Sequence, residues 1–189
     1  MTDYFALLEQ PLAPWLDLAA LKEVFHRKTL EQHPDSTWAA EGDFAKLNEA
    51  YQVLQDPKRR LHHLLELQGA PAASTNQVVP RELQELFLEI GGLNQRTAQL
   101  LEKTRAASNP LSRSLLTGEV VAAQKEIASL RNKVSELTEA ADERLRQMNP
   151  GWLINPAEQI ADTFALYLRF SYLGRWSAQL AELTFQLSS

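Results

Sequence analysis

Residues 116–141 read LTGEVVAAQKEIASLRNKVSELTEAA, and their apolar side chains follow one strict pattern. The apolar residues recur at alternating steps of four and three, at Leu116, Val120, Ala123, Ile127, Leu130, Val134, Leu137 and Ala141. A heptad seam sustained over more than three heptads is typical of a long helix that packs along partner helices. Asn109-Pro110 predicts where this helix begins, and Asn149-Pro150-Gly151 predicts where it ends.

Two further helical patterns flank the seam. Asn155-Pro156 opens the last one, and the one before the seam runs from about Pro80 to Ala106. Gly91-Gly92 lies inside the latter and should cost roughly 1 kcal/mol per glycine, so we expect a kink or break there. Trp152-Leu153-Ile154, between two turn signals, is expected to cover the end of the bundle. Three stripes joined by short turns predict an up-down-up three-helix bundle. The alternative is that part of the seam binds a second copy of the chain in a homodimer.

Shorter helices are predicted in the first 69 residues. Asp17 can cap a helix from Leu18 to about Gln32, an apolar stripe indicates a second from about Glu41 to Gln55, and Asp56-Pro57 opens a third that stops near Gly69. The stretch APAASTN at residues 70–76 has no charge and no periodicity, which is typical of a linker. We therefore predict an all-α protein with one domain over residues 1–69, a linker over 70–79 and a second domain over 80–189.

Composition excludes several classes of chemistry. The chain has 189 residues, a net charge of -5 and no cysteine, so it can form no disulfide, thiolate metal site or cysteine nucleophile. The acidic balance argues against nucleic-acid binding. No run approaches the roughly 18 apolar residues that span a membrane, and the first residues do not resemble a signal peptide. We expect a cytoplasmic protein, or one that lies in an organelle after removal of a transit peptide, without a cofactor, a bound metal or a membrane partner.

The tripeptide His33-Pro34-Asp35 stands between two amphipathic helical patterns. The helix before it carries Lys22, Phe25, His26 and Arg27 at spacings of three and four, and the helix after it reads FAKLNEAYQVL at residues 44–54. This arrangement resembles the J-domain, the module by which DnaJ-type co-chaperones stimulate the ATPase of DnaK-type chaperones. The alternatives are that the tripeptide is only a helix-ending turn and that the basic side chains are only a solvated face.

The resemblance to J-domains implies roles for individual residues. Asp35 would meet a basic residue on the chaperone, and His33 and Pro34 would fix the loop. The flanking contact would come from the preceding helix, through Lys22, Phe25, His26 and Arg27. One departure lies on that helix: Lys28 falls on the apolar stripe three residues beyond Phe25, where its methylenes can lie along apolar surface while the ammonium reaches water.

A narrower resemblance is to the HscB family of iron–sulfur cluster co-chaperones. Residues 57–69, PKRRLHHLLELQG, resemble the end of the J-domain in that family, Leu88-Glu89-Ile90 resembles the core of its scaffold-binding helix, and Leu168-Arg169-Phe170 resembles a string in its last helix. The resemblance implies that an IscU-type scaffold is the client and an HscA- or DnaK-type chaperone the partner. The implied client-binding residues are Leu83, Phe87, Leu88, Glu89 and Gly92.

Departures from the HscB pattern keep a second client open. Leu83-Gln84-Glu85 stands where the family has an apolar cluster, and Gly91-Gly92 replaces charged positions. A J-domain co-chaperone with a different client is therefore one alternative, and a dimeric helical scaffold with a degenerate J-domain is another. His62-His63 favours a structural or surface role over a metal site, since adjacent helical residues point about 100° apart. No catalytic constellation is present in the sequence, so we predict a regulator of a partner ATPase and not an enzyme.

Overall fold

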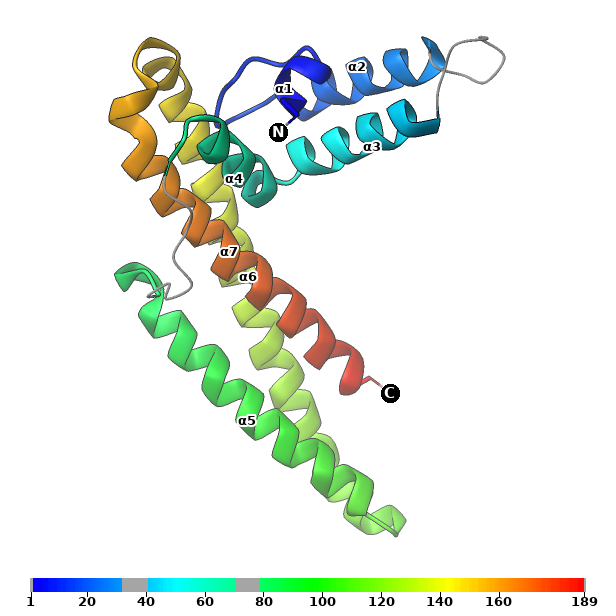
Figure 1. Cartoon of the computed structure of the whole chain (residues 1–189). Coiled ribbons are helices and arrows are strands. Elements are labelled where there is room, and N and C mark those ends of the chain that lie inside the picture. Colours follow the sequence, from blue (N-terminus) through cyan, green and yellow to red (C-terminus); the bar gives the residue numbers. More distant parts are fainter. Residues whose placement is uncertain (1, 32–40, 71–78, 189) are drawn as a thin grey trace. The chain divides into compact units, whose positions relative to one another are not determined.

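The computed structural model describes residues 2–31, 41–70 and 79–188, the side chains of residues 41–43 excepted, and these residues form helices without a strand (Figure 1). The elements are α1 (Tyr4–Leu7), α2 (Leu18–Glu31), α3 (Glu41–Gln55), α4 (Pro57–Leu67), the 3-10 turn η1 (Arg81–Leu83), α5 (Gln84–Ala106), α6 (Pro110–Ile154) and α7 (Pro156–Gln186). The all-α prediction is confirmed.

Capping residues fix where three of these helices begin. The Asp17 carboxylate accepts hydrogen bonds from the main-chain N–H groups of Ala19 and Ala20 at 2.8 and 3.3 Å. Asp56 accepts from the N–H of Arg59 at 2.8 Å, with Pro57 at the first helical position. Asn109 accepts from the N–H of Ser112 at 2.8 Å, directly before Pro110. Each cap satisfies amide donors that the first helical turn leaves without a main-chain acceptor, as the sequence predicted.

The chain divides into two compact units. Unit 1 contains Met1–Asn76 and Ala141–Phe170, and unit 2 contains Gln77–Ala140 and Ser171–Ser189. Helices α6 and α7 thus each contribute residues to both units, although composition alone placed the boundary in the predicted linker at residues 70–79. Most of that linker lies outside the described residues, and its extent stays a prediction.

Unit 1 has its core where α1 to α4 meet the adjoining ends of α6 and α7. Its fully buried side chains include Phe5, Leu8, Leu21, Leu47, Leu54, Leu61, Leu64, Leu145 and Trp152. The Arg60 guanidinium is buried among them and donates to the main-chain oxygens of Pro14 and Leu54 at 2.8 and 2.7 Å. Burial lowers the pKa of Arg60 to about 10, so this side chain remains protonated at neutral pH. It ties the segment before α2 to the end of α3.

Unit 2 is the bundle of α5, the first part of α6 and the last part of α7, which lie side by side (Figure 1). Its core contains Leu83, Leu86, Ile90, Leu93, Ile127, Leu130, Val134, Leu173, Trp176, Leu180 and Leu183. The heptad seam of α6 supplies Ile127, Leu130 and Val134 to this core, whereas Ala141 of the same seam is buried in unit 1. One continuous seam therefore serves two cores.

Two predicted helix interruptions are wrong. Helix α5 runs through Gly91-Gly92 without a break, because Ile90 and Leu93 on either side are buried in the core of unit 2. Helix α6 continues through Pro150 to Ile154, although proline supplies no amide hydrogen for the i−4 carbonyl. Neighbouring residues hold this last turn, since Asn149 exchanges two hydrogen bonds with the main chain of Trp15 and the Trp152 indole donates to the carbonyl of Leu12.

Candidate functional site

The three residues expected to form the centre of the chaperone contact, His33, Pro34 and Asp35, lie outside the described residues. The helix that precedes them, α2, is described to Glu31. Its surface is therefore where the predicted chaperone-binding site can be assessed.

Helix α2 separates the four predicted flanking residues into two groups. Lys22, His26 and Arg27 are exposed. Phe25 is partly buried, and its ring stacks on Tyr51 of α3 with 4.3 Å between centroids. Three of the four residues thus present polar or charged groups to solvent, while Phe25 joins α2 to α3.

An acidic residue that the sequence did not single out contacts this surface. Glu9, just after α1, places one carboxylate oxygen 2.8 Å from the Lys28 ammonium and accepts a hydrogen bond from the Arg27 guanidinium on the other. The hydrogen bond from Lys28 is the main reason that the pKa of Glu9 lies below its usual value. The Lys28 side chain is only 21% exposed, so its methylenes lie along apolar surface and its ammonium reaches Glu9.

The predicted client-binding residues occupy different environments around the start of α5. Leu83 is fully buried, so it supports the core of unit 2 and does not offer a surface. Phe87 and Leu88 are exposed, at 48% and 70%. Gly92 is partly buried one turn further along. The exposed part of this predicted site therefore centres on Phe87 and Leu88.

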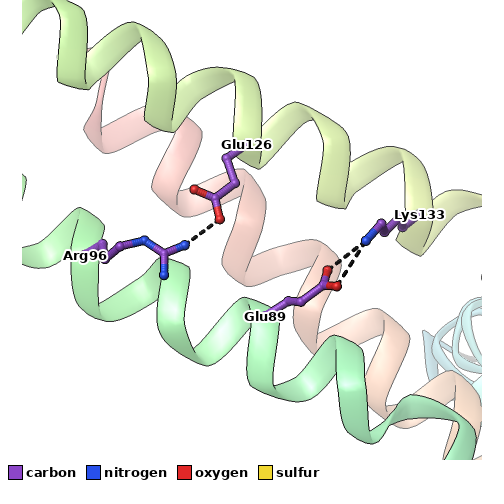
Figure 2. A network of polar contacts seen from close by, with 4 residues as sticks. All are labelled: Glu89, Arg96, Glu126 and Lys133. Carbon is purple, nitrogen blue, oxygen red and sulfur yellow. Dashed lines mark hydrogen bonds and ion pairs between the residues drawn. The ribbon is translucent and has the colours of Figure 1, made fainter.

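Glu89, the charged member of the predicted client-binding set, forms an ion pair within unit 2. Both of its carboxylate oxygens accept hydrogen bonds from the Lys133 ammonium on α6, at 3.2 and 2.9 Å (Figure 2). This contact raises the pKa of Lys133. Lys133 was not predicted from the sequence. It lies seven residues after Glu126, which pairs with Arg96, so α6 carries opposite charges one heptad apart, and this spacing was a signal for charge pairing with a neighbouring helix (Figure 2).

An acidic groove surrounds the Glu89–Lys133 pair. It encloses about 360 Å³ between α5 and α6 and is lined by Glu82, Glu85, Leu86, Glu89, Lys133, Glu136 and Leu137. Four carboxylates and one ammonium give the groove an excess of negative charge. Phe87 and Leu88 are on the same stretch of α5, so this end of the helix combines exposed apolar side chains with acidic ones.

His63 has a structural role in unit 1. Its ring is buried beside Tyr4 and Phe5, and its Nε2 accepts a hydrogen bond from the main-chain N–H of Tyr4 at 3.2 Å. Burial lowers the pKa of this imidazole, and the accepted hydrogen bond assigns the proton of the neutral ring to Nδ1. The adjacent His62 is half exposed and lies 3.3 Å from Glu66. The two histidines thus point into different surroundings.

The described residues show neither a metal-binding cluster nor a membrane-spanning helix. No three or more His, Cys, Asp or Glu side chains among them are grouped so as to hold a metal ion. None of the described helices combines the length and the apolar character needed to cross a membrane.

Comparison with known proteins matches the N-terminal part of the chain to a characterised domain. The DnaJ domain family matches residues 3–63. A chaperone protein DnaJ of Caulobacter vibrioides is 40% identical over 63 residues, which are 32% of this chain and 16% of that protein. An HscB co-chaperone homologue of Paraburkholderia phymatum is 37% identical over 82 residues, covering 39% of this chain and 46% of the relative. These two alignments span less than half of each relative.

Longer similarity extends over the whole arrangement of helices. An HscB co-chaperone homologue of Vibrio cholerae is 29% identical over 172 residues, covering 85% of this chain and 97% of the relative. The solved structure of HscB from Vibrio cholerae superposes with a TM-score of 0.52 at 21% identity, covering 98% of this chain and 99% of that one. Human HscB gives a TM-score of 0.53 at 19% identity, with 96% and 81% covered. The resemblance to J-domain and HscB proteins drawn from the sequence is confirmed.

Proposed function

We propose that this HscB-like J-domain protein stimulates ATP hydrolysis by a DnaK- or HscA-type chaperone and delivers a client protein to it. The observation that carries the proposal is the DnaJ domain match over residues 3–63, which includes the tripeptide at residues 33–35 and all of α2. The exposure of Lys22, His26 and Arg27 supports it, since a docking helix must keep its charged side chains accessible. Binding of the chaperone and of the client is then coupled through the chaperone's own conformational equilibrium.

The helix proposed to contact the chaperone, α2, has a small net charge. Helix α2 carries three cations (Lys22, Arg27 and Lys28) and two carboxylates (Glu23 and Glu31), for a net charge of +1. Electrostatic attraction to an acidic chaperone surface is therefore weak and is reduced by salt. Most of the specificity is assigned to His33, Pro34 and Asp35, with Lys22, His26 and Arg27 assisting association.

The client contact is assigned to the exposed start of α5. An IscU-type scaffold is the proposed client, and Phe87 and Leu88 supply exposed apolar area beside the carboxylates of the acidic groove. Large apolar side chains that are buried on association contribute most of the energy of many interfaces. Leu83 acts indirectly in this proposal, by packing under the first turn of α5.

An ATPase measurement tests the chaperone role. ATP turnover by the DnaK-type chaperone is measured alone, with the full chain, with His33→Gln and with His62→Gln. The wild-type chain and His62→Gln should accelerate turnover equally, because His62 is a half-exposed histidine of α4, whereas His33→Gln should lose the acceleration. Acceleration that survives His33→Gln, or that is absent with the wild-type chain, contradicts the co-chaperone role.

A binding measurement tests the client. The purified IscU-type scaffold is titrated into the wild-type chain, Leu88→Ala and Leu111→Ala, where Leu111 is an equally exposed leucine at the start of α6. Leu88→Ala should weaken binding by about tenfold or more, as a buried leucine contact in an interface does, and Leu111→Ala should leave it unchanged. Absence of binding at micromolar concentrations together with intact ATPase stimulation would assign the protein to a different client.

The alternative hypothesis is that the protein is a helical scaffold that dimerises through the heptad seam of α6. Ile127, Leu130 and Val134 of the seam are already buried in the core of unit 2, and the partly buried Leu137 packs against the same core, so the seam residues not assigned to a core lie in its earlier part. That part contains Leu116, Val120 and Ala123. The packing therefore favours the monomeric co-chaperone, and the molecular mass in solution tests the choice.

A further inference from the structure

The turn after α1 holds Glu9 in a defined position. The Glu9 N–H donates to the carbonyl of Ala6 at 3.2 Å, and the Gln10 N–H donates to the carbonyl of Phe5 at 2.8 Å. Between them, Glu9 adopts a positive φ of 52°, a left-handed conformation that most residues avoid. Because the backbone is fixed on both sides of it, the Glu9 carboxylate is aimed at α2 and does not depend on a long mobile loop.

One carboxylate there serves two cations. Oε1 of Glu9 lies 2.8 Å from the Lys28 ammonium, and Oε2 accepts from the Arg27 guanidinium. Arg27 belongs to the predicted chaperone-binding set, and its side chain remains 53% exposed. Glu9 is 52% exposed, so a protein that approaches Arg27 also meets the Glu9 carboxylate.

We propose that Glu9 is an internal counter-ion that weakens the docking of α2 on an acidic chaperone surface. The inference rests on the proposed co-chaperone function and adds a residue that regulates the same site. Adding the charge of Glu9 to the net +1 of α2 leaves this surface with no net charge. A chaperone carboxylate that binds Arg27 either displaces Glu9 from the guanidinium or comes close to a like charge, and both outcomes reduce affinity.

A competing effect has the opposite sign. Glu9 also restricts the Arg27 side chain, and a side chain that is already ordered loses less entropy when it binds. If that effect dominated, removal of the carboxylate would weaken chaperone binding. The sign of the change in affinity therefore decides between a counter-ion that competes with the chaperone and one that prepares Arg27 for it.

The test compares Glu9→Gln with Glu23→Gln in the full chain. Both substitutions remove one negative charge and keep a side chain of similar size, but only the first removes the contact with Arg27 and Lys28. Affinity for the ATP-loaded DnaK-type chaperone is measured at low and high salt, with thermal melts to show that each variant folds. We expect Glu9→Gln to bind about threefold more tightly at low salt and the gain to shrink at high salt. Glu23→Gln should gain less.

A double variant tests whether the gain in affinity from Glu9→Gln comes from the Glu9–Arg27 contact. In a chain carrying Arg27→Met, the gain from Glu9→Gln should fall to that of Glu23→Gln. Glu9→Gln that binds no more tightly than Glu23→Gln, or a gain that persists in full with Arg27→Met, overturns the inference. If the wild-type chain neither binds nor stimulates the chaperone in a His33-dependent way, the proposed function fails and this inference with it. Stimulation by the wild-type chain with unchanged binding by Glu9→Gln overturns the counter-ion role alone.

Discussion

Substitution of Trp152 tests whether the end of α6 belongs to the core of unit 1. The Trp152 side chain is 1% exposed, and its indole N–H donates to the carbonyl of Leu12 at 2.8 Å. Truncation of a buried aromatic side chain to alanine costs roughly 3–5 kcal/mol, through lost burial and the cavity that remains. At about 2–4 °C per kcal/mol for a chain of this size, Trp152→Ala should lower the melting temperature by roughly 6–20 °C.

A second substitution removes the hydrogen-bond donor and only part of the buried ring volume. Trp152→Phe keeps an aromatic ring but removes the donor, which leaves the Leu12 carbonyl without its partner at a cost of about 1–3 kcal/mol. The total loss for Trp152→Ala should therefore exceed that for Trp152→Phe. Leu153→Ala is the control, because Leu153 is the next residue of the same helix and is 63% exposed, so its truncation should change stability by less than about 0.5 kcal/mol.

Urea unfolding followed by circular dichroism gives the three free energies, and hydrogen exchange of the Trp15 amide reports on the same region. That amide donates to the Asn149 side chain at 2.9 Å, so it should exchange faster in Trp152→Ala than in the wild-type chain. If Trp152→Ala unfolds at the same urea concentration as Leu153→Ala, the last turn of α6 does not pack in the core of unit 1.

Two further predictions concern buried and paired charges. Because burial lowers the pKa of His63 below its value of about 6.5 in the unfolded chain, the unfolded state binds more protons in acid, and the free energy of unfolding should fall as pH drops below about 6.5. His63→Gln should flatten that fall in urea titrations at pH 7.5 and 5.5, and a slope equal to that of a His62→Gln control would contradict the assignment. Lys133→Glu should lower the melting temperature, more so at low salt, because it adds a carboxylate to the acidic groove. The charge-swapped pair Glu89→Lys with Lys133→Glu should recover part of the loss, and a double variant no more stable than Lys133→Glu would show that the contact is not formed.

The parts of the fold that sequence predicted well are local. Asp17, Asp56 and Asn109 each cap a helix through a hydrogen bond that spans two or three residues. The side chain and the amide that it satisfies are neighbours in the sequence, so the pattern of residue types contains the whole interaction. Helix starts were accordingly predictable without knowledge of packing.

Local rules failed where distant residues supplied a larger energy. Proline in a helix interior costs about 3 kcal/mol, which predicts that α6 ends before Pro150. Burial of Trp152 is of comparable size, and the hydrogen bonds that Asn149 and Trp152 make to the segment before α2 join residues 134 and 140 positions apart. The sequence alone does not show that this segment lies within reach of the end of α6. The prediction therefore included the cost of proline in a helix but not the tertiary contacts that offset it.

The candidate site shows the same division between local and distant information. The α2 side chains were predicted from their spacing on one helix together with the resemblance to J-domains, and Lys22, His26 and Arg27 are exposed in the structure. The contact from Glu9 crosses the turn between α1 and α2 and was not visible in the spacing. The net charge that the α2 surface presents to a partner protein therefore depends on the fold, because only the fold places Glu9 beside Arg27 and Lys28.

The pairing of α5 with α6 lies between these two cases. Its contacts join residues that are distant in the sequence, but the charged residues involved recur at a regular spacing on each helix. Three ion pairs join the helices at intervals of seven residues on each, namely Glu89–Lys133, Arg96–Glu126 and Lys103–Glu119. A slip of one heptad would place Glu89 opposite Glu126 in one direction and Arg96 opposite Lys133 in the other. Either slip keeps the apolar seam in contact but exchanges the three opposite-charge pairs for one like-charge pair and one opposite-charge pair, which is Arg96–Glu119 or Lys103–Glu126. The charges therefore favour one register where the seam alone leaves several open. Because Glu89 pairs with Lys133 in this register, we expect the selectivity of the proposed client surface to come mainly from its apolar neighbours Phe87 and Leu88.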